Sequence, residues 1–94
     1  MEFEWDVHNR EKNWEKHRVS DREAQEVFSR GLFLGPAKSD AEDRFAVIGK
    51  TKERRILFVV YTLRENKIRV ISARDASRKE RFIYEQKIKE TSPV

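Results

Sequence analysis

The side chains with the clearest chemical potential in this sequence are basic or able to transfer a proton. They are Lys16, His17, Arg44, Arg69, Arg74, Glu80 and Tyr84. An arginine guanidinium matches phosphate oxygens and keeps its charge, while a histidine titrates near neutral pH. Such groups can remove a proton from a ribose 2′-hydroxyl, stabilise a phosphorane and protonate a leaving 5′-oxygen. The set therefore fits metal-independent cleavage of RNA that leaves a 2′,3′-cyclic phosphate.

A structural explanation competes with the chemical one at these positions. His17 stands near the expected end of a helix, where an imidazolium complements the helix dipole. Glu80 has the spacing of a helix-capping residue. Arg69 and Arg74 are expected either to contact phosphate or to form ion pairs with acids among residues 40–43. Residue type and spacing alone leave both explanations open.

Other kinds of active site have weak support. His8 and His17 lack the spacing of a joint metal site, and the chain has no cysteine. No glycine-rich phosphate loop or nucleophile elbow is present. We therefore expect neither a metal nor a cofactor.

Charge is distributed unevenly along the 94 residues. Residues 1–43 hold 7 Lys/Arg and 11 Asp/Glu, whereas residues 44–94 hold 14 and 6. A basic C-terminal half is what a phosphate-binding surface needs, although a solvated surface has the same composition. The length predicts a single domain over residues 1–94. An acidic N-terminus and the lack of a membrane-length apolar stretch predict a cytoplasmic protein.

The expected N-terminal elements are a short strand and a first helix. Residues 3–5 alternate apolar and polar side chains, which is typical of an edge strand. Asp6 is expected to cap a charged helix that ends near His17. Trp14 is the expected apolar anchor of this helix.

A second helix and a loop follow. Ser20 and Glu23 have capping-box spacing and predict the start of the helix. It should end near Gly31, which we expect in a left-handed conformation. Residues 31–43 are predicted to form a loop, with a brief strand at 32–34.

Three strands are predicted next, at Arg44–Gly49, Ile56–Leu63 and Lys67–Arg74. The second is apolar on both faces and should be central. Regular alternation in the third would place Arg69, Ile71 and Ala73 on one face.

Ser77 and Glu80 then begin a final helix whose apolar contacts are expected from Phe82, Ile83, Tyr84 and Ile88. The short connections favour an antiparallel meander. The predicted fold class is therefore α+β, with two N-terminal helices, an antiparallel sheet of three to four strands and a C-terminal helix.

Two groups of residues resemble motifs of the BrnT family of toxins. The first comprises Phe3-Glu4-Trp5-Asp6, Asn13, Lys16-His17, Val19-Ser20, Glu23-Ala24 and Val27-Phe28. The second comprises the run Arg69 to Arg74 with Ala76, Arg78, Glu80 and Tyr84. Between them, Glu42, Arg44-Phe45 and Gly49 also fit. The resemblance covers about Phe3 to Glu85, and two motifs in the right order make it specific.

This resemblance implies a RelE-like endoribonuclease toxin of a type II toxin–antitoxin system, which cleaves RNA and inhibits translation. It implies a cognate BrnA-like antitoxin and contact with operator DNA only indirectly, through that antitoxin. The implied catalytic residues are His17, Arg69, Arg74, Glu80 and Tyr84. The implied RNA-binding residues are Lys16, Arg44 and Arg78.

The chain differs from the family pattern at the turn between the first two helices. Arg18 stands where the family usually has glycine, and Asp21 stands where it usually has an aromatic residue. A left-handed turn at Arg18 would be costlier than at glycine. Two alternatives to a nuclease remain: a non-catalytic RNA- or partner-binding module on the same scaffold, and a degenerate copy with a structural role.

Overall fold

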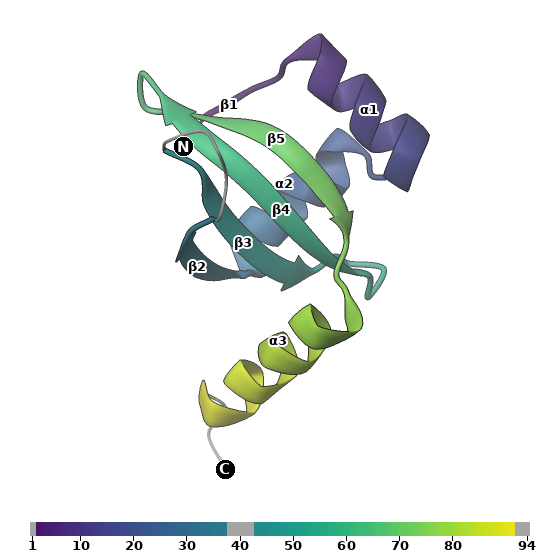
Figure 1. Ribbon diagram of the computed structural model, residues 1–94, viewed down its shortest axis with the longest axis vertical. Coiled ribbons are helices and arrows are strands. Elements are labelled where there is room, and N and C mark those ends of the chain that lie inside the picture. Colours follow the sequence, from purple (N-terminus) through teal and green to yellow (C-terminus); the bar gives the residue numbers. More distant parts are fainter. Residues whose placement is uncertain (1, 38–42, 92–94) are drawn as a thin grey trace.

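The computed structural model describes residues 2–37 and 43–91, which fold into three helices and five strands (Figure 1). The elements are β1 (Glu2–Glu4), α1 (Val7–His17), α2 (Asp21–Arg30), β2 (Leu32–Pro36), β3 (Phe45–Lys50), β4 (Ile56–Arg64), β5 (Lys67–Asp75) and α3 (Arg78–Thr91). The predicted α+β class and element order are confirmed, with boundaries that differ by a residue or two.

The strands form one sheet in the order β1-β5-β4-β3-β2, with β4 at its centre as predicted. Strands β2 to β5 make the expected antiparallel meander. The expectation of three to four antiparallel strands is wrong in one respect, because β1 adds a fifth strand parallel to β5. β1 supplies backbone partners to the first residues of β5, which would otherwise form an open sheet edge.

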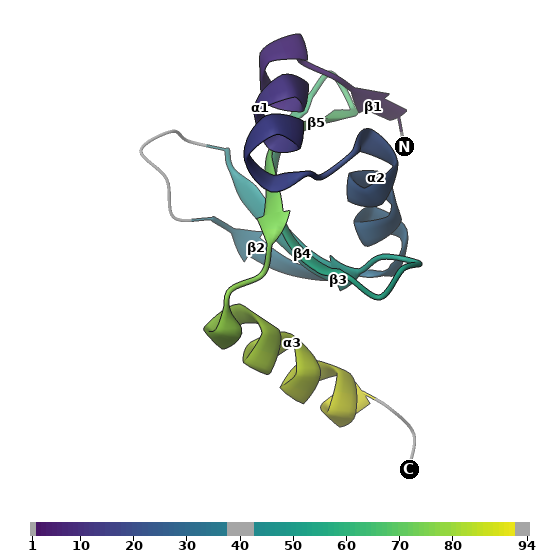
Figure 2. The ribbon, with the colours of Figure 1, turned by 90° about the vertical axis from the view of Figure 1, so that its right-hand side faces the viewer.

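Two helices cover one face of the sheet, which we term the inner face. α2 packs on β3 and β4, and α1 packs on β5 (Figures 1 and 2). The principal core lies here and includes Val19, Ala24, Val27, Val47, Leu57, Val59, Tyr61, Ile68, Val70 and Ala73. Burial of these apolar side chains is the main stabilising contribution in a domain of this size.

α3 leaves the end of β5 and projects from the opposite face, the outer face (Figure 2). Tyr84 is its buried anchor and packs in a small cluster with Ile48 and Ala76. Phe82 and Ile83 do not form the expected apolar contacts, since both are exposed and Phe82 retains 62% of its accessible area. Ile88 is also exposed rather than buried. α3 meets the sheet through Glu80 and Tyr84 near its start, and the helix then extends away from it.

The helix ends follow the sequence with two exceptions. Asp6 accepts the backbone N–H of Asn9, and Ser20 and Glu23 form the predicted capping box. Gly31 is extended (φ −92°) rather than left-handed. Glycine is needed there because a Cβ would lie 2.4 Å from the carbonyl oxygen of Val27.

The second exception is Trp14, which was expected to anchor α1 but is 49% exposed. The Arg18 guanidinium stacks over its ring at 5.3 Å, and Arg18 itself is left-handed (φ 53°). Asn13 is the buried residue of this helix instead.

Candidate active site on the outer face of the sheet

A β-bulge in β5 brings two candidate arginines to the same face. Arg69 and Arg74 are five residues apart, so regular alternation would place them on opposite faces. In the observed register Arg69 pairs with Thr62 and Arg74 pairs with Phe58, while Ile71 has no paired residue. Both arginines therefore share the outer face with Phe58 and Thr62 of β4.

The bulge also corrects the predicted face of β5. Ala73 was expected beside Arg69, but it lies in the inner core with Val70. The outer face carries Ala46 and Ile48 of β3, Phe58, Val60 and Thr62 of β4, and Arg69, Ser72 and Arg74 of β5. The one unpaired residue, Ile71, therefore places both Arg69 and Arg74 on the outer face and makes that face basic.

α1 holds the bulged part of β5, which extends beyond β1. Lys12 Nζ donates to the carbonyl oxygen of Ile71 at 3.2 Å. The Ala73 backbone N–H donates to Asn13 Oδ1 at 3.2 Å. These contacts satisfy backbone groups that would otherwise be orphaned at the sheet edge. They explain why Asn13 is buried, and they fix the strand that carries both arginines.

Arg74 and Glu80 form the best-defined polar cluster on this face. The guanidinium donates to both carboxylate oxygens of Glu80, at 2.8 and 3.0 Å, and lies 4.7 Å over the ring of Phe58. Hydrogen bonds from Arg74 lower the pKa of Glu80 and outweigh its burial, and the Ser77 backbone N–H adds to the effect. Glu80 is therefore a carboxylate at neutral pH, held beside a cation that presents further N–H groups.

The expected capping role of Glu80 is present as well. Ser77 Oγ accepts the Glu80 backbone N–H at 3.1 Å, and Glu80 Oε1 accepts the Ser77 backbone N–H at 2.8 Å. One carboxylate thus both starts α3 and orients Arg74. Tyr84 lies one turn further on and is 7% exposed, so it anchors α3 beneath Glu80. Arg78 is exposed on the first turn.

Arg69 and Arg44 lie at the other end of the outer face. Arg69 forms an ion pair with Glu4 of β1, and its hydrogen bond lowers the pKa of Glu4. Continuing the β3–β4 register by one residue places Arg44 beside Thr62. Arg44 Nη1 and Arg69 Nε are buried without an acceptor among the described residues. The expected acids at residues 40–42 lie outside the described residues.

A groove separates the two ends. It encloses about 430 Å³. Its lining is Leu34, Pro36, Ala37, Ala46, Phe58, Val60, Arg74 and Glu80. An apolar floor bordered by an arginine–carboxylate pair suits a ligand with a flat apolar part and a charged part.

His17 and Lys16 do not join this arrangement. Lys16 is exposed on α1, and His17 lies at the helix end near Asp75, whose pKa its charge helps to lower. Asp75 is paired with Arg55 and follows Arg74 on β5, so its side chain is directed away from the outer face. His17 therefore belongs to a different group of side chains from Arg74 and Glu80.

Arg55 is the centre of that second group, and sequence reasoning missed it because its only local signal is an arginine in a charged turn. It donates to the carbonyl oxygens of His17 and Arg18 at 2.6 and 2.7 Å. It also pairs with Glu23 at 3.2 Å and with Asp75 at 2.7 Å. These bonds join the end of α1, the start of α2 and the end of β5, and the hydrogen bonds to Asp75 and Glu23 raise the pKa of Arg55.

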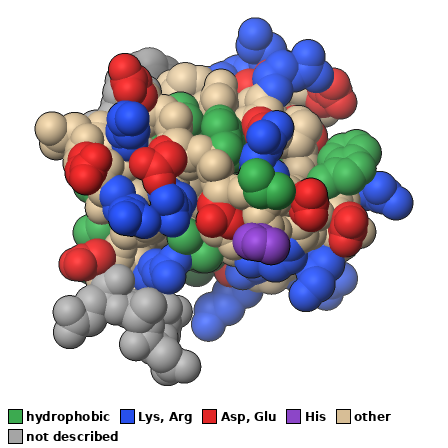
Figure 3. All heavy atoms as spheres, turned by 90° about the horizontal axis from the view of Figure 1, so that it is seen from above, with side chains coloured by type: hydrophobic (Ala, Val, Ile, Leu, Met, Phe, Trp, Pro, Cys, Tyr) green, Lys and Arg blue, Asp and Glu red, His purple; other side chains and the backbone are tan. Residues whose placement is uncertain are grey.

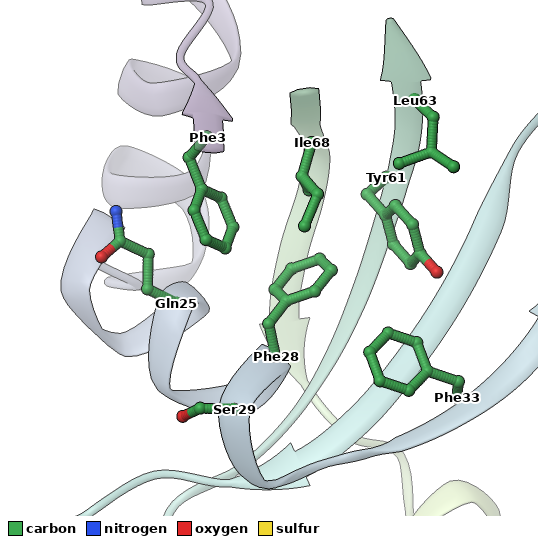
Figure 4. A pocket seen from close by; sticks show the side chains of 8 residues that line it. All are labelled: Phe3, Gln25, Phe28, Ser29, Phe33, Tyr61, Leu63 and Ile68. Carbon is green, nitrogen blue, oxygen red and sulfur yellow. The ribbon is translucent and has the colours of Figure 1, made fainter. Parts of the chain in front are cut away.

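An aromatic pocket of about 370 Å³ opens on the inner side (Figure 4). Four aromatic rings, one each from β1, α2, β2 and β4, face a common space in this pocket. They belong to Phe3, Phe28, Phe33 and Tyr61. Burial raises the pKa of Tyr61, which keeps its phenol neutral. The pocket has no cation or carboxylate and so offers no chemistry for a phosphodiester.

Charge elsewhere is mixed. Figure 3 shows the end that carries α1 and the β4–β5 hairpin, where Lys and Arg side chains alternate with Asp and Glu. Among the residues that the structure describes, no group of three or more His, Asp or Glu could hold a metal, and no helix is long and apolar enough to cross a membrane. The outer face combines three arginines, an ionised carboxylate and a groove, and it is therefore our candidate site.

Comparison with known proteins identifies the family of this chain. Residues 5–80 match the family described as "Ribonuclease toxin, BrnT, of type II toxin-antitoxin system". A crystal structure of the Brucella abortus ribonuclease toxin, BrnT, has 29% sequence identity and a TM-score of 0.68, over 83% of this chain and 99% of that one. No curated protein sequence matches the chain significantly. The part of α3 beyond Glu80 lies outside the family match.

Proposed function

The chain belongs to the BrnT family of ribonuclease toxins of type II toxin–antitoxin systems, and on that premise we propose that it cleaves RNA, without a metal, on the outer face of its sheet. The observation that carries this proposal is the Arg74–Glu80 pair. It places a cation and an ionised carboxylate side by side at the edge of a groove. RNA cleavage needs both functions.

The proposed reaction is an in-line transfer to the ribose. Glu80 accepts the proton of the 2′-hydroxyl, whose oxygen forms a bond to the adjacent phosphorus. Arg74 donates hydrogen bonds to the non-bridging oxygens as negative charge grows on them. The bond to the 5′-oxygen then breaks, solvent water in the open groove protonates the leaving oxygen, and the resulting hydroxide takes the proton from Glu80. The products are a 2′,3′-cyclic phosphate and a free 5′-hydroxyl.

The cations already present support the proposal of metal independence. Three arginines lie on one face, and a guanidinium stabilises a phosphorane without the deprotonation equilibrium of a bound water. Arg69 and Arg44 supply positive charge along the strand, whereas Lys16 and Arg78 are exposed and would contact phosphates outside the groove.

Positioning is the role proposed for Tyr84. Its burial against Ile48 fixes the first turns of α3, and with them the orientation of Glu80. His17 is assigned to the Arg55 group rather than to proton transfer, because Asp75 and Arg55 separate it from Arg74.

The biological setting follows from the family. An antitoxin, by resemblance a BrnA-like protein, would block the groove with an amphipathic segment, and acidic residues in it would offset the arginines. Operator DNA would then be bound only through the antitoxin. Cleavage of RNA in the cytoplasm would inhibit translation.

Purified protein incubated with RNA in the presence of a chelator tests the proposal. We expect cleavage with 2′,3′-cyclic phosphate ends, and at least a hundredfold loss of rate in Glu80→Gln, which keeps the side-chain shape and one acceptor oxygen but removes the base. Arg22→Ala, on the exposed side of α2, is the matched control and should cleave normally. Intact RNA with well-folded protein would contradict the proposal and favour a binding module.

A further inference from the structure

One row of side chains crosses β1, β5 and β4 and ends at the residue that precedes β3, at the end of the outer face away from α3. The pairing registers align Glu4 with Arg69, Arg69 with Thr62 and, by continuation, Thr62 with Arg44. Neighbouring strands lie about 4.8 Å apart, so the two arginines flank Thr62 at a separation that one small anion can bridge.

The positive charge of this row is only partly balanced by acidic residues. Glu4 balances Arg69, but Arg44 forms no ion pair with any residue that the structure describes. Each guanidinium also has a buried N–H group without an acceptor, Nη1 in Arg44 and Nε in Arg69. A buried donor of a charged group is costly to leave unpaired. Phosphate oxygens would supply acceptors that the described residues do not provide here.

The distance from this row to Arg74 can be compared with the spacing of phosphates along an RNA strand. Arg69 pairs with Thr62 and Arg74 with Phe58, four residues apart on β4. At a rise of about 3.3 Å per residue, the two rows are roughly 13 Å apart. That is more than the spacing of adjacent phosphates and matches about two nucleotides of an extended strand. The groove floored by Val60 and Ala46 lies between the rows.

We propose that Arg44 and Arg69 form a second phosphate subsite about two nucleotides from Arg74, so that the substrate is single-stranded RNA lying along β4 with an unstacked base in the intervening groove. This proposal rests on the proposed function only for the position of the scissile phosphate. An unstacked base in an apolar groove is a single-strand mode of recognition, because a duplex keeps its bases paired and stacked.

The test is binding of 2′-O-methyl oligonucleotides of two to six nucleotides, which cannot be cleaved. Wild-type protein should bind tetranucleotides and longer strands at least tenfold more tightly than dinucleotides. Arg44→Ala should weaken the longer strands about tenfold and leave the dinucleotide unchanged. It should also reduce the salt slope by about 0.7, the value for one phosphate contact in a single strand.

Three further variants serve as controls for this experiment. Arg22→Ala is the matched control and should retain the full length dependence and salt slope. If Arg44→Ala unfolds, Arg44→Gln removes the charge with less change of shape, and Arg44→Lys should restore most of the salt slope.

The outcomes separate this proposal from the proposed function. An unchanged slope and length dependence in Arg44→Ala would overturn the subsite even if RNA is cleaved. A duplex of equal length that binds as tightly as the single strand would overturn the single-strand assignment. Loss of length dependence in Arg44→Ala would support the subsite even if no cleavage is detected.

Discussion

Arg55→Ala should destabilise the fold more than any other single arginine substitution. Arg55 is 25% exposed and donates to two carbonyl oxygens at the end of α1 as well as to Glu23 and Asp75. Alanine would leave Glu23, which is 14% exposed, with an unpaired charge, and would leave the two carbonyls to water. Asp75 is 65% exposed and contributes little, because solvent screens an exposed pair.

The magnitude follows from these partners. Hydrogen bonds to a charged group are worth about 1.5–3 kcal/mol, and loss of the Glu23 pairing adds to this, so we expect a cost of about 2–4 kcal/mol. For a domain of this length the melting temperature should fall by roughly 10–20 °C. Thermal unfolding followed by circular dichroism measures it. Arg54→Ala is the matched control, since Arg54 is exposed and adjacent.

The pH dependence gives an independent check. Burial would raise the pKa of Glu23, but hydrogen bonds from Ser20 and Arg55 outweigh it, and Arg55 lowers the pKa of Asp75. A carboxyl with a lowered folded pKa stabilises the fold above its ordinary value and loses that contribution as the pH falls through the folded value. Wild-type stability should therefore drop below about pH 4.5, and the difference between wild type and Arg55→Ala should narrow there, because only the bonds from Arg55 to the two carbonyl oxygens remain. Equal melting temperatures for Arg55→Ala and Arg54→Ala at pH 7 would refute the reasoning.

Three further predictions concern single positions. Arg18→Gly should raise the melting temperature by a few degrees in a thermal melt, because glycine removes about 1 kcal/mol of left-handed strain and loses only an exposed stack on Trp14; an unchanged or lower value would contradict this. Gly31→Ala should cost at least about 2 kcal/mol in urea unfolding, because the new Cβ would clash with two carbonyl oxygens, and a smaller cost would show that the backbone can yield. If Glu80 is the base, kcat/KM should fall only below its ordinary pKa of 4.5, because the folded pKa is lower still; an acid limb near neutral pH would contradict the assignment.

The sequence predicted the elements well because their signals are local. Capping boxes at Ser20 and Ser77, and the Asp6 cap, depend on side chains three residues apart, and each formed as expected. The apolar run of β4 likewise marked the central strand. Such patterns need no knowledge of the tertiary structure.

The errors arose where the outcome depends on distant partners. The bulge at Ile71 is stabilised by Lys12, 59 residues away in the chain, so no strand periodicity could reveal that Arg69 and Arg74 share a face. Trp14 has the composition of a core residue, yet the helix turns Asn13 inward to meet Ala73.

For the candidate site, the sequence likewise predicted which residues take part but not which of them contact one another. Arg69, Arg74 and Glu80 were selected by residue type and motif, and the fold places them on or beside the outer face. The pairing of Arg69 with Glu4, and the separation of His17 from Arg74, depend on the parallel β1–β5 contact and on Arg55.

The most direct test of the central claim is the cleavage rate of Arg74→Ala. The variant should fold, since Arg74 is about one-third exposed, and its melting temperature serves as the check. Loss of one donor to a transition-state oxyanion typically costs a factor of about 100–1,000, and we expect a loss of that size under single-turnover conditions, with Arg22→Ala unchanged. A folded Arg74→Ala protein that cleaves RNA at the wild-type rate would contradict the assignment of the reaction to the outer face.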